Sequence, residues 1–217
     1  FEDLKGVIFL NPMHTSEEDG RPKYLPADEY LSGNVREKLA IAKRSAELHP
    51  EDYGENVRAL EAVQPVDLTA SEISVRLGAT WLTLEIIEEF MFELFSTPRY
   101  CQWNIHVHYA QYTGEWNVEG KSYDRSNVKA YNTYGTGRVN GYKIMEETLN
   151  LRDVRIFDYI EDGNGMKTAL LNKKETAIAQ GKQELIKQAF ADWIWSDPER
   201  REQLTKLYNE KFNSIRP

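Results

Sequence analysis

Hydrophobic positions recur with a helical period up to about Tyr100, change to a period of two there, and return to a helical period after Gly141. From residue 26 to 46 an apolar side chain returns every three to four positions, which predicts a helix that ends before Pro50. Gly33 lies inside this helix and costs roughly 1 kcal/mol relative to alanine, so a break or a new start near Ser32 is an open alternative. Further helices are predicted over 51–63 and 84–95, the latter with four glutamates facing solvent: Glu85, Glu88, Glu89 and Glu93.

The period-two region predicts strands. Alternation at Ile105, Val107 and Tyr109 predicts a strand that turns at Thr113-Gly114 and returns over 115–118. A further strand is predicted over 128–134. Two more, over 154–160 and 166–172, flank Asp162-Gly163-Asn164-Gly165, which is a strong hairpin signal. Helices are predicted at 141–151 and on both sides of Asp197-Pro198.

These elements together predict an α+β fold, in which N-terminal helices precede a central, mostly antiparallel sheet with hairpins and C-terminal helices pack back on it. We expect residues 1–217 to form a single α+β domain cut from a larger protein. Its parts are a short strand plus helices at 1–65, a helix plus antiparallel sheet at 66–172, and C-terminal helices at 173–217. A chain of 217 residues with 41% hydrophobic and 29% charged residues is long and apolar enough to bury a core.

Composition narrows the class of protein. The net charge of −8 argues against a protein that coats nucleic acid generally, because such proteins carry a basic footprint. The only cysteine, Cys101, cannot form an intramolecular disulfide and fits a reducing compartment. No apolar run approaches the ~18 residues of a membrane span. We therefore expect a soluble, cytoplasmic protein with no membrane partner.

Particular stretches of the chain resemble one protein family. The clearest is Tyr30-Leu31-Ser32-Gly33-Asn34-Val35-Arg36-Glu37-Lys38-Leu39. Others are Asn132 to Thr136, Leu149-Asn150, Glu184 to Lys187 with Phe190 and Trp193, Asp197 to Arg201, and Leu207 to Asn213. They resemble large proteins of plasmids, phages and conjugative elements that join an adenine-specific DNA methyltransferase to a Swi/Snf-type superfamily II helicase. The chain is similar to the segment just upstream of the helicase core. The resemblance implies that ATP and S-adenosylmethionine bind to other domains of the parent protein.

One stretch stands out by charge. From 121 to 143 there are five basic residues and one acid, interleaved with tyrosines. Lysine and arginine neutralise phosphates, tyrosines stack on unpaired bases, and Gly135, Gly137 and Gly141 permit a close approach to a ligand. The candidate nucleic-acid-binding residues are Lys121, Arg125, Lys129, Tyr131, Tyr134 and Arg138. The alternative is a hairpin whose tyrosines pack and whose cations offset neighbouring acids.

Other patterns in the sequence are weaker evidence for a binding or catalytic site. Residues 114–122 resemble a phosphate-binding loop but have five residues, not four, before Gly120-Lys121, so coincidence is the better interpretation. Asn11-Pro12 is better explained as a turn at a strand end than as a base-binding methyltransferase motif. His106 and His108 share one strand face, yet without a second ligand pair they predict no metal site. The five tryptophans, Trp103 among them, are expected in the core or between domains.

We expect no catalytic residue, metal or cofactor in this chain. The prediction for function is a non-catalytic spacer or DNA-engagement domain of the methyltransferase/helicase protein, with DNA and the neighbouring domains as partners. The alternative is a docking module for contacts within the polypeptide or with another protein, without DNA binding. The overall charge favours docking, and the basic segment favours DNA.

Overall fold

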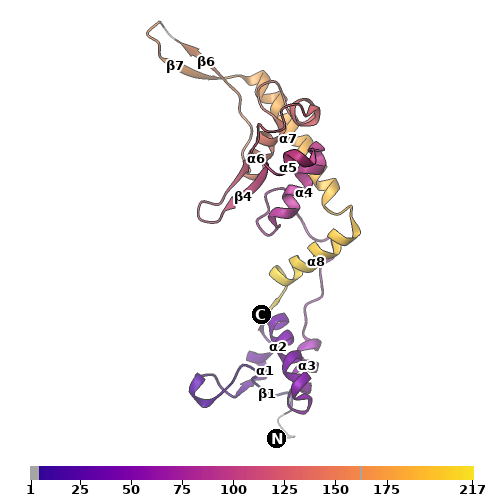
Figure 1. The fold of residues 1–217 in the computed structure, drawn as a ribbon. Coiled ribbons are helices and arrows are strands. Elements are labelled where there is room, and N and C mark those ends of the chain that lie inside the picture. The colour runs from indigo at the N-terminus through magenta and orange to yellow at the C-terminus, as the bar shows by residue number, and fades with distance from the viewer. Residues whose placement is uncertain (1–4, 162) are drawn as a thin grey trace. The chain divides into compact units, whose positions relative to one another are not determined.

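The computed structural model describes residues 5–161 and 163–217, which divide into two compact units. One unit contains the described residues up to Ile73 together with Glu202–Pro217, and the other is Ser74–Arg201. Helices lie at both ends of the chain and small antiparallel sheets lie between and beside them, so the predicted α+β class is confirmed (Figure 1). In the described part of the chain, no helix combines the length and the apolar character needed to cross a membrane.

The first unit is built on two antiparallel helices. Phe9 stacks on Tyr30, with 5.0 Å between ring centroids, and both belong to a core completed by Val35, Ala42 and Leu60. The predicted first helix is broken near Ser32: Gly33 has φ +68°, and the Asn34 side chain accepts from the Glu37 N–H to start a new helix. The elements are β1 (Ile8–Leu10), a 3₁₀ turn (Glu17–Asp19), β2 (Tyr24–Pro26), α1 (Ala27–Tyr30), β3 (Gly33–Asn34), α2 (Val35–Leu48), α3 (Pro50–Ala62), most of α8 (Pro198–Phe212) and β8 (Ile215–Arg216).

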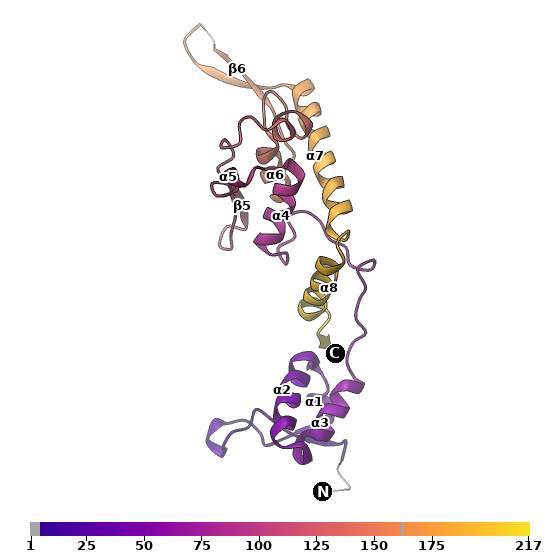
Figure 2. The same ribbon diagram turned by 45° about the vertical axis from the view of Figure 1, so that its right-hand side comes forward.

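The second unit packs three helices around aromatic side chains. Phe90 on α4 meets Phe190 on α7 edge to face, and Phe95 at the end of α4 meets Tyr142 on α6 in the same way. Figures 1 and 2 show α4, α6 and α7 side by side. The elements are α4 (Leu84–Phe95), α5 (Arg99–Gln102), β4 (His106–Ala110), β5 (Glu115–Glu119), a π-helical turn (Lys129–Thr133), α6 (Gly141–Leu149), β6 (Phe157–Glu161), β7 (Lys167–Leu171) and α7 (Lys173–Ile194).

Among the described residues, the strands pair antiparallel in four two-stranded sheets: β1–β2, β3–β8, β4–β5 and β6–β7. Both hairpins predicted from alternation are present, in the registers His106↔Glu119 to Ala110↔Glu115 and Phe157↔Leu171 to Glu161↔Lys167. Asp162, a predicted turn residue of the second hairpin, lies outside the described residues. Because Val107 and Val118 are buried while His106 and His108 are exposed, β4–β5 covers the core with one face only.

The strand predicted over 128–134 was wrong, since Lys129–Thr133 is a π-helical turn. The Asn127 side chain accepts from the Ala130 N–H at 3.0 Å and donates to the Phe95 carbonyl at 2.9 Å, which starts the turn and fixes it to the end of α4. A Cβ on Gly135 would lie 2.3 Å from the Ala130 carbonyl oxygen, so the backbone that leaves the turn packs directly against the turn.

The glutamate face of α4 is largely exposed, as predicted, with Glu85, Glu89 and Glu93 exposed and Glu88 half-buried, but three of the four also bind neighbouring elements. Glu88 accepts the Val107 N–H at 2.7 Å, Glu93 accepts the Trp193 indole N–H at 2.7 Å, and Glu89 pairs with Arg200 at 3.2 Å. The Arg200 guanidinium also lies 3.5 Å from the centre of the Trp193 ring. These carboxylates therefore attach α4 to its neighbours, which periodicity alone could not reveal.

Candidate nucleic-acid interface

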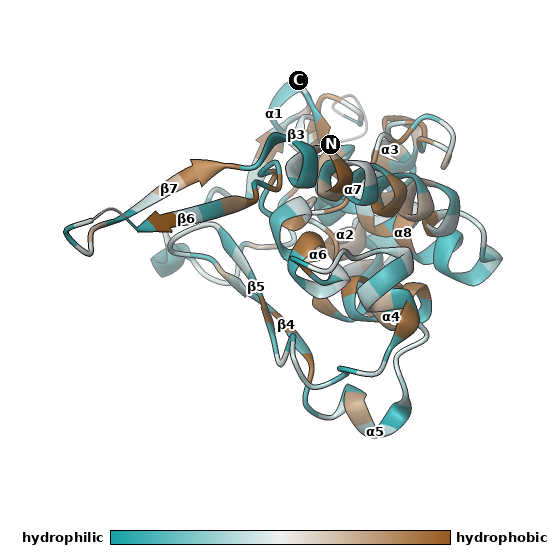
Figure 3. Ribbon diagram, turned by 90° about the horizontal axis from the view of Figure 1, so that it is seen from above, coloured by the Kyte–Doolittle hydropathy of each residue, from teal (hydrophilic) through white to brown (hydrophobic). Residues whose placement is uncertain are grey.

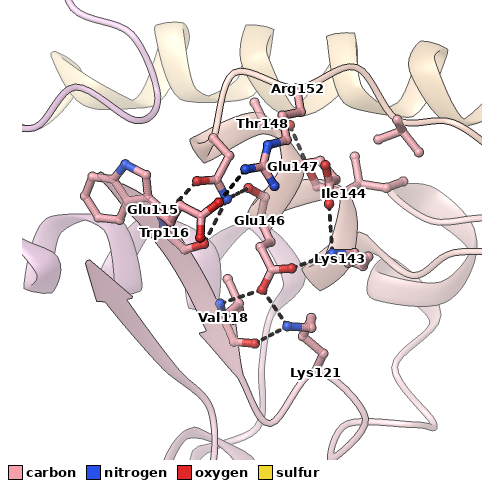
Figure 4. Close-up of polar contacts among 12 residues, drawn as sticks. Glu115, Trp116, Val118, Lys121, Lys143, Ile144, Glu146, Glu147, Thr148 and Arg152 are labelled. Carbon is pink, nitrogen blue, oxygen red and sulfur yellow. Dashed lines mark hydrogen bonds and ion pairs between the residues drawn. The ribbon is translucent and has the colours of Figure 1, made fainter. Parts of the chain in front are cut away.

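Lys121, the first of the predicted phosphate-binding residues, belongs to an internal ion cluster around Glu146 on α6 (Figure 4). The buried Glu146 carboxylate accepts from Lys121 Nζ at 2.5 Å, from Lys143 Nζ at 2.5 Å and from the Val118 N–H at 2.9 Å. Lys143 also pairs with Glu147 at 2.8 Å, and Lys121 Nζ donates to the Val118 carbonyl at 2.6 Å. The cluster joins the end of β5 to α6.

Protonation of Glu146 reflects this cluster. Burial opposes its ionisation, but hydrogen bonds from Lys121, Lys143 and the Val118 N–H outweigh burial and hold the pKa of the carboxyl below its ordinary value. The carboxylate is therefore charged at neutral pH and holds both ammonium groups. Lys121 has a structural partner and is not a free cation.

Three more of the predicted residues are also engaged within the chain. Arg138 pairs with Asp158 at 2.8 Å and donates to the Phe157 carbonyl at 2.8 Å, at the base of the β6–β7 hairpin. The half-buried Tyr134 ring lies 5.9 Å from that of Phe95, centroid to centroid. Tyr131 accepts from Asn140 Nδ2 at 3.3 Å. The structure thus brings these side chains to the packed interior and to the hairpin base rather than to one open face.

The glycines of the basic segment serve the fold. A Cβ on Gly141 would lie 2.8 Å from the Phe95 ring, and one on Gly135 would clash with the Ala130 carbonyl, so both are required for packing inside the unit. Gly137 has open space around it. The predicted close approach of glycines to a ligand therefore does not apply to Gly135 or Gly141.

Arg125 and Lys129 remain available to bind phosphate. Both are exposed; Arg125 Nε donates to the Ser122 carbonyl at 3.1 Å, and Lys129 Nζ donates to Ser96 Oγ at 2.8 Å. Neither has an ion-pair partner among the described residues. Their charged groups face solvent, and no carboxylate of the described residues lies within ion-pair distance of them.

A second segment lies against the one that carries these two cations. Residues 96–104 and 120–129 meet at Lys129–Ser96, at Asn127–Phe95 just before the first segment, and at Cys101 Sγ, which donates to Asp124 Oδ1 at 3.8 Å. Gly120 has φ +73°, and a Cβ there would lie 1.9 Å from the Asn104 carbonyl oxygen. The two segments are therefore closely packed along their length.

Three exposed aromatic side chains lie on these segments. Tyr100 is 72% exposed, Trp103 82% and Tyr123 63%, and Arg99 is exposed beside them. Trp103 therefore lies outside the core, which was one of the two places expected for it; the other, an interface between domains, stays a prediction. We define the aromatic–basic surface as Arg99, Tyr100, Trp103, Tyr123, Arg125 and Lys129.

The aromatic–basic surface carries no exposed acid. Asp124, the single acidic residue in 96–104 and 120–129, is 2% exposed. Its carboxylate accepts from Tyr142 at 2.9 Å and from Asn127 at 2.5 Å, and Tyr142 also shares a hydrogen bond of 2.7 Å with Thr97. The sequence pointed to the second segment only, because the first lies some twenty residues earlier and has a single cation of its own.

The buried network under the surface is not a nucleophile site. Burial, reinforced by the neighbouring Asp124 carboxylate, raises the pKa of the Cys101 thiol, so the thiol stays protonated. Burial likewise raises the pKa of Tyr142 above its ordinary value. Both groups act as hydrogen-bond donors that hold the two segments in place.

The remaining candidates do not assemble a site. His106 and His108 lie on the exposed face of β4, 3.5 Å from Glu88 and 3.0 Å from Glu119 respectively, with ring centroids 6.3 Å apart. Neither belongs to the one cluster in the described part of the chain whose ligand atoms lie close enough for a shared metal ion, which is the exposed set His49, Glu51 and Asp52. The loop-like sequence 114–122 is largely β5, with Trp116 and Val118 buried, and so forms no phosphate cradle.

Comparison with known proteins identifies a family. A family model described as "Domain of unknown function (DUF8437)" matches residues 76–214, which is more than half of the chain. The chain belongs to this family. Searches of curated proteins and of solved structures found no match.

Proposed function

We propose that this chain is a non-catalytic DNA-engagement domain of a large protein that joins an adenine-specific DNA methyltransferase to a Swi/Snf-type helicase. The parent protein is inferred from the resemblance of stretches such as Tyr30 to Leu39 and Asp197 to Arg201. In this proposal, ATP and S-adenosylmethionine bind to other domains, and the protein works in the cytoplasm. The observation that supports DNA binding most directly is the aromatic–basic surface.

The charge distribution supports this surface over the other cations of residues 121–143. Lys121, Lys143 and Arg138 have carboxylate partners within the unit, whereas Arg99, Arg125 and Lys129 have none among the described residues. An unpaired surface cation gains more from a phosphate than a paired one, because no existing ion pair has to be broken. A local positive surface thus coexists with the net charge of −8.

The test is a DNA-binding titration with matched charge variants. Labelled single- and double-stranded DNA is titrated with the 217-residue chain and followed by fluorescence anisotropy at low and moderate salt. The triple variant Arg99→Gln, Arg125→Gln, Lys129→Gln removes the unpaired cations. The control, Arg58→Gln, Lys187→Gln, Lys206→Gln, removes three cations that lie next to acids on their own helices.

The expected result is that the triple variant loses most of the affinity for DNA while the control retains it. Absence of binding by the unmodified chain at low salt contradicts the proposal. Equal losses in the two triple variants also contradict it, because they indicate non-specific attraction.

A second candidate function is docking to a neighbouring domain of the same polypeptide, and the β6–β7 hairpin favours it. Figures 1 and 2 show this hairpin extending beyond α6 and α7, and Figure 3 shows apolar segments on both of its strands. The register places Phe157, Tyr159, Ala169 and Leu171 on one exposed face. An exposed apolar ribbon of two strands is marginally stable alone and gains stability from a partner. If the double variant Tyr159→Thr, Leu171→Thr still co-purifies with the flanking domains as the unmodified chain does, this candidate fails.

A further inference from the structure

We propose that the aromatic–basic surface binds an unpaired DNA strand in preference to a duplex. This inference rests on the DNA-engagement function proposed above and specifies the form of DNA that the surface takes. Its basis is the combination of three exposed rings, Tyr100, Trp103 and Tyr123, with three cations that lack carboxylate partners.

The rings select for unpaired bases. Within a duplex each base face is covered by its neighbours, so a protein reaches only base edges in the grooves. An unpaired strand exposes base faces, and an aromatic side chain can stack on them with little dependence on sequence. Trp103, 82% exposed, offers the largest free ring surface of the three and is the expected main stacking residue.

The cations complement the rings. Proteins that bind single strands combine stacking rings with positive groups that follow the phosphates. Arg99 directly precedes Tyr100, and Arg125 lies two residues after Tyr123, so each part of the surface carries both kinds of group. Lys129, fixed by Ser96, connects the two segments. A protein partner with an apolar face would leave these three charges without a counterpart, whereas a nucleic acid strand supplies both base faces and phosphates.

The rings are presented on a fixed support. Asp124 is bound by Cys101, Asn127 and Tyr142 beneath the surface, and Gly120 packs against the backbone of Asn104. A preformed site loses less conformational entropy on binding than a mobile loop does. This supports measurable affinity for a strand that covers only a few nucleotides.

The test compares oligodeoxythymidine of about 12 nucleotides, which forms no secondary structure, with a blunt duplex of the same length. Trp103→Ala is expected to weaken binding to oligodeoxythymidine by about five- to hundredfold, as for the loss of one stacked base, and to change duplex binding far less. Trp103→Phe retains a ring and is expected to restore most of the affinity. Tyr112→Ala is the matched control, since Tyr112 is 102% exposed at the tip of the β4–β5 hairpin, outside the surface.

Intrinsic fluorescence at saturating oligodeoxythymidine gives a second readout. Stacking of thymine on Trp103 is expected to quench part of the tryptophan emission, and Trp103→Phe is expected to remove that part. Loss of affinity for both DNAs to the same extent in Trp103→Ala, or no loss for either, overturns the inference while leaving DNA engagement intact. Absence of binding to either DNA by the unmodified chain overturns both proposals.

Discussion

Replacing Glu146 with glutamine tests whether the ion cluster around it holds the second unit together. The substitution keeps the size of the side chain and an oxygen that can accept the Val118 N–H, but removes the charge that binds Lys121 and Lys143 at 2.5 Å each. Each charge-assisted hydrogen bond contributes about 1.5–3 kcal/mol. Breaking a fully buried ion pair costs about 3–5 kcal/mol.

The expected loss of unfolding free energy is smaller than for a fully buried ion pair, because the Lys121 side chain is 28% exposed and Lys143 keeps Glu147 as a partner. We expect Glu146→Gln to lower the free energy of unfolding by about 2–3 kcal/mol. Glu147→Gln is the control, since Glu147 pairs only with Lys143 among the described residues, at 2.8 Å, and its loss should cost less than about 1 kcal/mol. Urea denaturation followed by circular dichroism measures both. Equal losses in the two variants would show that the cluster contributes no more than a surface pair.

Three further predictions follow from the same contacts. Because the pKa of Glu146 is lowered in the folded chain, its contribution to stability is complete above the ordinary value of 4.5 and is lost as the pH falls below that value. The difference in unfolding free energy between the unmodified chain and Glu146→Gln should therefore shrink as the pH falls below 4.5. Gly120→Ala should destabilise the chain by about 1–3 kcal/mol and weaken DNA binding, because φ is +73° and the new Cβ would meet the Asn104 carbonyl. Gly137→Ala is the control: Gly137 has open space around it, so the variant should be near neutral in the same urea denaturation. Asn209→Ala should cost about 2–3 kcal/mol, since its buried amide bonds both the N–H and the carbonyl of Leu68. Asn213→Ala removes an exposed bond to Val66 and a bond to Asn209 but leaves both Leu68 bonds in place, so it should cost less in thermal unfolding.

Local patterns in the sequence predicted the elements well where the structure depends on neighbours in the chain. The apolar stripe of 84–95 gave the α4 helix, and alternation around Ile105 to Tyr109 gave the β4–β5 hairpin. Residues 128–134 were also predicted to form a strand but contain a helical turn, because Asn127 caps it and ties it to Phe95. The hydrogen bond from Asn127 to the Phe95 carbonyl, thirty-two positions away, leaves no periodic signal.

The candidate site was predicted only in part, for a related reason. Counting charges over 121–143 treats every cation as available, yet Lys121 is neutralised by Glu146, twenty-five residues later, and Arg138 by Asp158, twenty residues later. Arg125 and Lys129 stayed candidates because no carboxylate reaches them within the described residues. Arg99, Tyr100 and Trp103 could not be joined to them from the sequence, since packing around Asp124 brings the two segments together.

The salt dependence of DNA binding tests the central claim most directly. For a single strand, the logarithm of affinity falls with the logarithm of salt concentration by about 0.7 per neutralised phosphate, so three unpaired cations predict a slope of about −2. The triple variant Arg99→Gln, Arg125→Gln, Lys129→Gln is expected to bring that slope close to zero, and the paired-cation control to leave it unchanged. A slope near zero for the unmodified chain, or one that the triple variant does not alter, would contradict the assignment of DNA binding to the aromatic–basic surface.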